Sequence, residues 1–370
     1  MKVTRPLRVL VVDDSAAFRV MLADATTATG HARVVATAWN GNEALRKLEI
    51  YQPDVITLDV EMPVMGGLEF LEALRANRCT IPVIVVSAVT TQGAEAAIRA
   101  LDLGAREIIT KPRGGTLQGN VDELRRQMRE VFGALQAELL ADDEAASSPD
   151  LREAEPRDAR PSRMMRARAE VQPMTAPQIV AIGSSTGGPG ALARVIPRLP
   201  PNLPVPVLVV QHMPAVFTRS LADMLHQKSA VRVREATHGE LLQPGTAYIA
   251  PGGLHMRVAP VTDGSYALEL TEDPPEQYCR PSVDYLFRSV ADCFRASCLG
   301  IILTGMGRDG TVGATHMKRY GAHVIAQNAE TSTVFGMPRE AIANGVVDEI
   351  LPIDDIAAAI VAAVQGRRLS

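Results

Sequence analysis

The chain has 370 residues, of which 46% are hydrophobic and 22% charged, and its formal net charge is −4. This length exceeds the size at which a single core stops growing, so two domains are expected. The composition is too apolar for wholesale disorder, and the acidic balance offers no broad surface for a nucleic-acid backbone.

Neither a membrane span nor an export signal is expected. The longest apolar runs, 205–210 and 356–364, fit buried elements and fall well short of the roughly 20 residues that span a bilayer. The N-terminal apolar run meets two aspartates instead of a cleavage site, which predicts a cytoplasmic protein. The four cysteines include no C-x-x-C pair, so the sequence predicts neither a zinc site nor a disulfide framework. We expect reduced, mostly packed thiols at Cys79, Cys279, Cys293 and Cys298.

From residue 5 to about 140, short apolar runs alternate with segments of helix length. The runs are RVLVVDD, HARVVATAW, PDVITLDV, IPVIVVSA and REIITKP. This alternation predicts a first α/β domain over 5–140 with a doubly wound, five-stranded parallel sheet. Residues 141–177 are rich in Asp, Glu, Arg, Ala and Pro and lack a sustained apolar period, which predicts a linker with at most a nascent helix.

Polar residues end the predicted strands of the first domain. Asp13 and Asp14 end the first strand, Asp59 the third, Ser87 the fourth and Lys111 the fifth. Carboxyl ends of parallel strands share one edge, where converging carboxylates repel unless a hard cation such as Mg²⁺ neutralises them. Each acid alone equally fits a solvated loop residue or a helix N-cap, but the set in register favours a site.

Residues 178–368 predict a second α/β domain with a doubly wound, mainly parallel sheet. Its apolar runs are QIVAIG, VPVLVV, TAYIAP, CLGIILTG and AHVIAQ. Between Tyr248 and Leu270, alternating residues around Asp263 and Gly264 predict an antiparallel hairpin.

The first strand of this domain leads into a glycine-rich turn that contains Ser185. The segment Gly183–Gly187 satisfies G-x-S-x-G, the pattern of a nucleophile elbow, although glycine-flanked serines are also common in ordinary turns.

The same stretch also fits a dinucleotide-binding signature. Gly188, Gly190 and Ala193 match G-x-G-x-x-A after a strand. That hypothesis requires an acid at the end of the next strand, where Gln211 and His212 stand instead, so it is disfavoured.

His212 is the best candidate base for Ser185, because it ends the strand expected to neighbour the serine's own strand. His255, after a glycine turn, is its only serious competitor. Asp309, the one acid in the loop TGMGRDG, is the candidate third member, although it also fits a helix N-cap. The other histidines are expected at surface or packing positions: His31, His226, His238, His316 and His323.

Six strings of the second domain stand out: GSSTGGPGAL, QHMPAVFTRSLA, PGTAYIAPGGLHM, RPSVDYLF, ILTGMGRDG and IAQNAETSTVFGMPREA. As a set they resemble the catalytic domain of chemotaxis protein-glutamate methylesterases. The resemblance implies that Ser185, His212 and Asp309 are catalytic and that Thr186 and Met306 line the site. It also implies hydrolysis of glutamate methyl esters on chemoreceptor helices, with methanol as product, no cofactor for the esterase reaction, and deamidation of receptor glutamines as a second activity.

The first third of the chain resembles receiver domains of two-component response regulators. By that resemblance, Asp59 accepts a phosphoryl group from a chemotaxis histidine kinase, and Ser87 and Lys111 hold its oxygens. The Mg²⁺ ligands would be Asp13, Asp14, Asp59 and the Glu61 carbonyl.

One residue departs from the receiver pattern. Ile108 stands three positions before Lys111, where receivers usually carry an aromatic switch residue. An unphosphorylated receiver that covers the esterase cleft is the expected form of regulation. The alternatives are a phosphorylation-dependent adaptor that only binds a partner helix and a nucleotide-binding response regulator.

Overall fold

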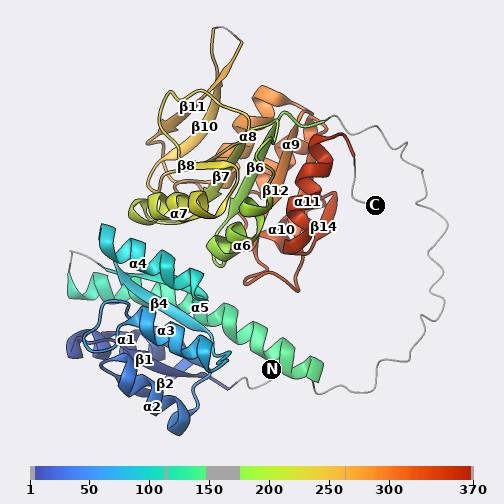
Figure 1. The fold of residues 1–370 in the computed structure, drawn as a ribbon. Helices are drawn as coiled ribbons and strands as arrows, with labels where there is room; N and C mark the ends of the chain where they lie inside the picture. Colours follow the sequence, from blue (N-terminus) through green and yellow to red (C-terminus); the bar gives the residue numbers. More distant parts are fainter. Residues whose placement is uncertain (1–4, 113–115, 147–175, 263, 368–370) are drawn as a thin grey trace, which may run out of the picture.

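The computed structural model describes residues 5–112, 116–146, 176–262 and 264–367 (Figure 1). Each half of the chain forms its own parallel sheet with helices on both faces, as the sequence predicts. Among the described helices, none combines the length and apolarity needed to cross a bilayer.

The first domain is a five-stranded parallel sheet in the order β2-β1-β3-β4-β5. Helices α1 and α5 cover one face, and α2, α3 and α4 cover the other. The elements are β1 (Leu7–Val12), α1 (Ala16–Ala28), β2 (Ala32–Ala38), α2 (Gly41–Tyr51), β3 (Val55–Leu58), α3 (Gly67–Ala76), β4 (Val83–Ala88), α4 (Thr91–Asp102), β5 (Glu107–Lys111) and α5 (Leu117–Ala146).

Helix α5 continues to Ala146 and so enters the range predicted as linker from residue 141. The rest of that predicted linker, apart from its last two residues, lies outside the described residues.

The second domain has a seven-stranded parallel sheet in the order β14-β13-β12-β6-β7-β9-β8 and a separate antiparallel pair, β10 and β11. The pair confirms the predicted hairpin. The elements are β6 (Ile179–Ser184), α6 (Gly188–Val195), η1 (Ile196–Arg198), β7 (Val207–Gln211), α7 (Ala215–Lys228), β8 (Arg232–Glu235), β9 (Thr246–Ile249), β10 (His255–Pro260), β11 (Tyr266–Thr271), α8 (Val283–Phe294), β12 (Cys298–Ile302), α9 (Thr311–Arg319), β13 (His323–Gln327), α10 (Met337–Ala343), β14 (Glu349–Leu351) and α11 (Ile353–Val364).

The topology of the second sheet determines where a site can form. Strand β6 lies at its centre, with β7 on one side and β12 on the other. Because these strands are parallel, the carboxyl ends of β6, β7 and β12 lie at one edge of the sheet, next to the point where the strand order reverses. Open α/β sheets bind ligands at such points.

The two domains pack against each other through α4 and α7. Ile98 of α4 lies in the core that α6, α7 and α11 share, and Phe217 of α7 is fully buried against the core of the first domain. An ion pair joins Asp102 to Lys228 at the rim of this contact. The first domain is thus docked on the end of the second sheet from which the catalytic candidates project.

Candidate active site

Ser185 lies in a tight turn between β6 and α6. Its backbone N–H donates to the Thr304 carbonyl at 3.0 Å, and its carbonyl accepts from the N–H of Gly188 at 2.7 Å. Gly187 has φ +76°, and a Cβ there would lie 2.3 Å from the Cβ of Thr333, so only glycine fits. The turn brings Ser185 to the wall of a cleft of about 830 Å³ that Thr186, His212 and Met306 also line.

Gln211 holds this turn from the neighbouring strand. Its side-chain amide donates to the Ser185 carbonyl at 2.8 Å, and its oxygen accepts from the Ser184 hydroxyl at 2.7 Å. A Cβ at Gly188 would lie 1.9 Å from that oxygen, so glutamine fills the space beside the glycines. From the sequence, Gln211 only disfavours a dinucleotide site. Its role in positioning the serine turn is visible only in the structure.

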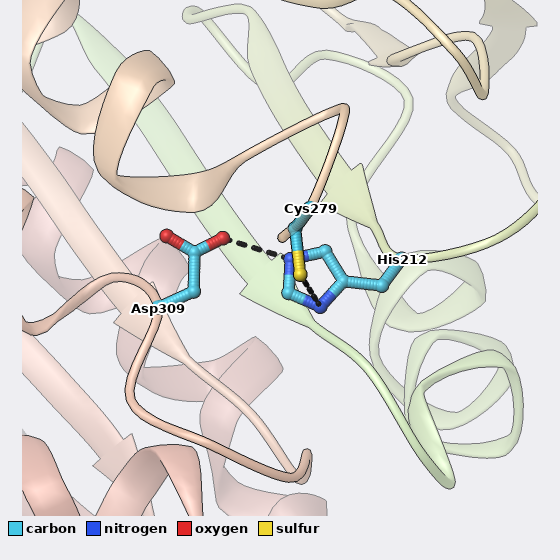
Figure 2. Close-up of side chains that lie close together, drawn as sticks. All are labelled: His212, Cys279 and Asp309. Carbon is cyan, nitrogen blue, oxygen red and sulfur yellow. Dashed lines mark hydrogen bonds and ion pairs between the residues drawn. The ribbon is translucent and has the colours of Figure 1, made fainter. Parts of the chain in front are cut away.

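His212 and Asp309 are joined by a hydrogen bond, as Figure 2 shows. Strand β7 pairs with β6, as predicted, and His212 follows it directly. Its Nε2 lies 2.8 Å from Oδ2 of Asp309, which follows β12 on the other side of β6. Two loops far apart in sequence thus bring an imidazole and a carboxylate together beside the serine turn.

The start of α8 holds the Asp309 carboxylate. Oδ2 accepts from the Val283 N–H at 2.7 Å, and Oδ1 accepts from the Asp284 N–H and the Ser282 hydroxyl, both at 2.9 Å. A carboxylate at a helix N-terminus also interacts favourably with the helix dipole. The segment RPSVD, for which the sequence predicts no chemistry, therefore binds and positions the Asp309 carboxylate.

This environment separates the pKa values of the pair. Burial opposes ionisation of Asp309, but the hydrogen bond and charge of His212, together with the donors of α8, outweigh it and lower the pKa of Asp309. Burial likewise opposes the imidazolium, yet the hydrogen bonds to Asp309 and Cys279 raise the pKa of His212 to about 10. The pair favours a carboxylate beside a strongly basic imidazole.

His255, the competing candidate base, is fully buried away from the serine turn. Its Nδ1 accepts from the Ser282 N–H at 3.2 Å, its Nε2 faces the Pro274 carbonyl at 3.1 Å, and its ring stacks on Tyr285. Both ring nitrogens are engaged, so His255 supports the start of α8.

The second ring nitrogen of His212 faces Cys279. Nδ1 lies 3.6 Å from the cysteine Sγ (Figure 2), and no hydrogen bond of the Ser185 hydroxyl occurs among the residues that the structure describes. Catalytic hydrogen bonds often tighten only when substrate is bound. Cys279 is half-buried, like Cys79 and Cys293, and lines the same cleft as Ser185.

The first domain brings its predicted residues together at the carboxyl edge of its sheet. Ligand oxygens of Asp13, Asp14 and Asp59 lie within 4.8 Å of one another. Lys111 Nζ lies 2.8 Å from Asp13 Oδ2 and 2.6 Å from Asp59 Oδ2. Burial and the neighbouring carboxylate of Asp13 outweigh this lysine and raise the pKa of Asp59 to about 6.

The remaining two residues predicted for this site lie beside it. The Ser87 hydroxyl donates to the Gly93 carbonyl at 2.9 Å, at the start of α4. The Glu61 N–H donates to Asp59 Oδ1 at 3.3 Å, so the backbone of Glu61 adjoins the carboxylates.

A side chain of the first domain reaches the serine turn. Oε2 of Glu107, the first residue of β5, accepts from the Gly187 N–H at 2.8 Å. Enclosure between the domains raises the pKa of Glu107 to about 7. The sequence carried no signal for this contact, because it forms only when the domains dock.

Each domain of the chain matches a known protein family. Residues 180–360 match the family model described as CheB methylesterase, and residues 9–118 match the response regulator receiver domain. A protein-glutamate methylesterase/protein-glutamine glutaminase of Desulfotalea psychrophila is 40% identical over 96% of this chain and 98% of its own length. A protein of the same name from Geobacillus kaustophilus is 45% identical, with the same coverage.

The chain belongs to the CheB methylesterase family. Among solved structures, the Thermotoga maritima CheB methylesterase catalytic domain is 43% identical and covers 50% of this chain and 98% of its own, with a TM-score of 0.49. In this methylesterase-family chain the glycine turn, the imidazole and the seated carboxylate meet where the central strands of the second sheet end.

We expect His212 to titrate well above the ordinary histidine value near 6.5. Because its pKa is raised on folding, the stabilisation it contributes is complete below about pH 6.5 and is lost as the pH rises through about 10. NMR titration of the ring nitrogens of His212 should show this. Asp309→Asn should lower the pKa of His212 and reduce the loss of unfolding free energy at alkaline pH. An unshifted His212 in the unsubstituted chain would contradict the assignment.

Proposed function

We propose that the chain is a phosphorylation-activated protein-glutamate methylesterase, which removes methyl esters from glutamates on the cytoplasmic helices of chemoreceptors and releases methanol. The same site would convert certain receptor glutamines to glutamate, in keeping with the double name of the relatives. The observation that carries the proposal is the bond between His212 and the seated carboxylate of Asp309, on the cleft that Ser185 lines. The substrate helices lie in the cytoplasm, where we expect the chain to act.

In the proposed reaction, the Ser185 hydroxyl attacks the ester carbonyl and passes its proton to Nδ1 of the neutral imidazole of His212, which is the minor form below a pKa of about 10. Nδ1 is the available nitrogen because Asp309 engages Nε2. Backbone N–H groups at the start of α6, or that of Met306, are the candidate donors to the oxyanion. The tetrahedral intermediate then expels methoxide, which takes the proton from His212 and leaves as methanol. Water repeats these steps on the acyl-enzyme and frees the glutamate carboxyl group.

Replacing Ser185 with alanine tests the assignment of the nucleophile. Loss of a nucleophile typically lowers kcat by about 10⁶-fold, so Ser185→Ala should release no measurable methanol from methylated receptor membranes. Ser332→Ala is a matched control, because Ser332 lines the adjoining cleft and its hydroxyl only bonds the Asn328 carbonyl. Normal methanol release by Ser185→Ala would refute the assignment of Ser185 as nucleophile, whereas no release by the unsubstituted chain would favour the adaptor or the nucleotide-binding hypothesis.

Docking of the receiver domain supports autoinhibition. The substrate is a glutamate side chain, and the carboxylate of Glu107 already occupies the Gly187 N–H beside the nucleophile. We infer that Glu107 acts as an internal mimic of the product. A receptor glutamate can then reach the serine turn only when the receiver moves away.

Strand β5 connects this contact to the proposed phosphorylation site. It begins with Glu107 at the serine turn and ends with Lys111 on Asp59. Ile108 packs against the cores of both domains, so at this position an aliphatic contact across the interface replaces the expected aromatic switch. A phosphoryl group on Asp59 would change the partner of Lys111 and, through β5, weaken the docked state.

The carboxylates of the receiver fit a magnesium ion. Asp13, Asp14 and Asp59 offer the hard oxygen donors that Mg²⁺ prefers, within 4.8 Å of one another. When bound, the ion would neutralise charge between these carboxylates and the incoming phosphoryl group. Lys111 and Ser87 would hold the phosphoryl oxygens on Asp59, with a chemotaxis histidine kinase as the donor.

Phosphorylation at Asp59 should raise the esterase activity. Acetyl phosphate with Mg²⁺ should increase methanol release by the unsubstituted chain, because phosphorylation favours the undocked receiver. Asp59→Asn should abolish the increase. Asp24→Asn, which changes an exposed acid on α1, should be activated normally. Equal activation of all three proteins would remove phosphorylation at Asp59 from the proposal.

Removing the Glu107 carboxylate should raise activity without phosphorylation. Because burial raises the pKa of Glu107 to about 7, the docked side chain is partly neutral and its hydrogen bond contributes about 1 kcal/mol, so Glu107→Ala should increase the unphosphorylated rate by roughly fivefold. Glu72→Ala, an exposed acid on α3, serves as the control. Methanol release without a phosphodonor measures the effect, and an unchanged rate in Glu107→Ala would refute product mimicry by this residue.

A further inference from the structure

Cys279 lies beside the imidazole nitrogen that the proposed reaction needs. Its Sγ is 3.6 Å from Nδ1 of His212, on the side of the ring opposite Asp309 (Figure 2). One ligand atom from each of these three residues lies within 4.8 Å of the others. The thiol of Cys279 has no part in the proposed ester hydrolysis.

The spacing of sulfur and nitrogen matches two ligands of one tetrahedral zinc ion. Zinc binds thiolate sulfur at about 2.3 Å and imidazole nitrogen at about 2.0–2.1 Å, which at a tetrahedral angle puts the two atoms about 3.5 Å apart. The distance between Sγ and Nδ1 is therefore compatible with one ion bound by both Cys279 and His212.

Asp309 completes the arrangement from the far side of the ring. Zinc-binding histidines usually donate their other ring N–H to a carboxylate, which orients the ring and increases its basicity. His212 Nε2 is already bonded to Asp309 in this way. Because both oxygens of Asp309 also accept bonds from the start of α8, we expect it to orient the imidazole without binding the ion itself.

The loop that carries Cys279 directs the thiol into the open cleft. Gln277 and Tyr278 have φ values of 51° and 64°, and they form a tight turn closed by a two-way backbone pairing of Glu276 with Cys279. Tyr278 is fully exposed, and Cys279 and His212 line both clefts of the site. An ion from solvent thus has a path to both ligands.

We propose that Cys279 and Nδ1 of His212 form an inhibitory binding site for Zn²⁺. On binding, the thiol proton and the Nδ1 proton of the imidazolium pass to solvent, a zinc–sulfur bond forms, and the freed Nδ1 lone pair is donated to the metal. Water fills the remaining positions. His212 can then no longer accept the proton of Ser185, so the esterase stops. The inhibition rests on the proposed function, whereas the binding of the metal does not.

The test uses the full chain, reduced and freed of transition metals, with acetyl phosphate and Mg²⁺ present. Added Zn²⁺ should suppress methanol release, and a zinc-selective chelator should restore it. Relative to its own rate without zinc, Cys279→Ser should need at least about tenfold more Zn²⁺ for half inhibition. Cys293→Ser, with a partly buried thiol in the same domain that donates to the Val258 carbonyl, should respond like the unsubstituted chain.

Cobalt binding provides a second readout that does not depend on the esterase. Co²⁺ should give a thiolate-to-cobalt charge-transfer absorption in the unsubstituted chain and in Cys293→Ser, and none in Cys279→Ser. Absence of this band in the unsubstituted chain, or equal zinc inhibition of Cys279→Ser, would overturn the proposal. A band in a chain that releases no methanol would uphold the metal site and count only against the proposed function.

Discussion

The hydrogen bond between Asp309 and His212 is the interaction on which the rest of the site depends. A buried carboxylate is costly unless donors surround it, and here the start of α8 supplies them. Once seated, Asp309 fixes the orientation of the imidazole and raises its pKa. Every proposed role of His212, as base for Ser185 or as ligand for zinc, follows from which ring nitrogen this bond leaves available.

The second constraint is the space beside the serine turn. Gly187 and Gly305 let neighbouring loops approach closely, because a Cβ on Gly305 would lie 2.8 Å from that of Ser185. The Gly187 N–H, in the serine turn, donates to a carboxyl group. In the docked state that group is Glu107 of the receiver, so catalysis and regulation compete for one donor.

The receiver and esterase sites are joined by a single short strand. Lys111 at one end of β5 balances Asp13 and Asp59, and Glu107 at the other end contacts the serine turn. A charge added at Asp59 alters the ion pair between Asp59 and Lys111. Lys111 lies on β5, the strand that forms part of the domain interface. Coupling over this distance requires that β5, the edge strand that pairs with β4, move as a unit.

The amino-acid sequence by itself determined both α/β domains, the hairpin and the candidates Ser185, His212 and Asp309. Apolar periodicity and glycine turns are local properties, and parallel strands bring their carboxyl ends to one edge. Only the tertiary structure decided the seat of Asp309 on α8, the clamp by Gln211, the reach of Glu107 and the position of Cys279. These contacts join residues distant in sequence, so no local pattern records them.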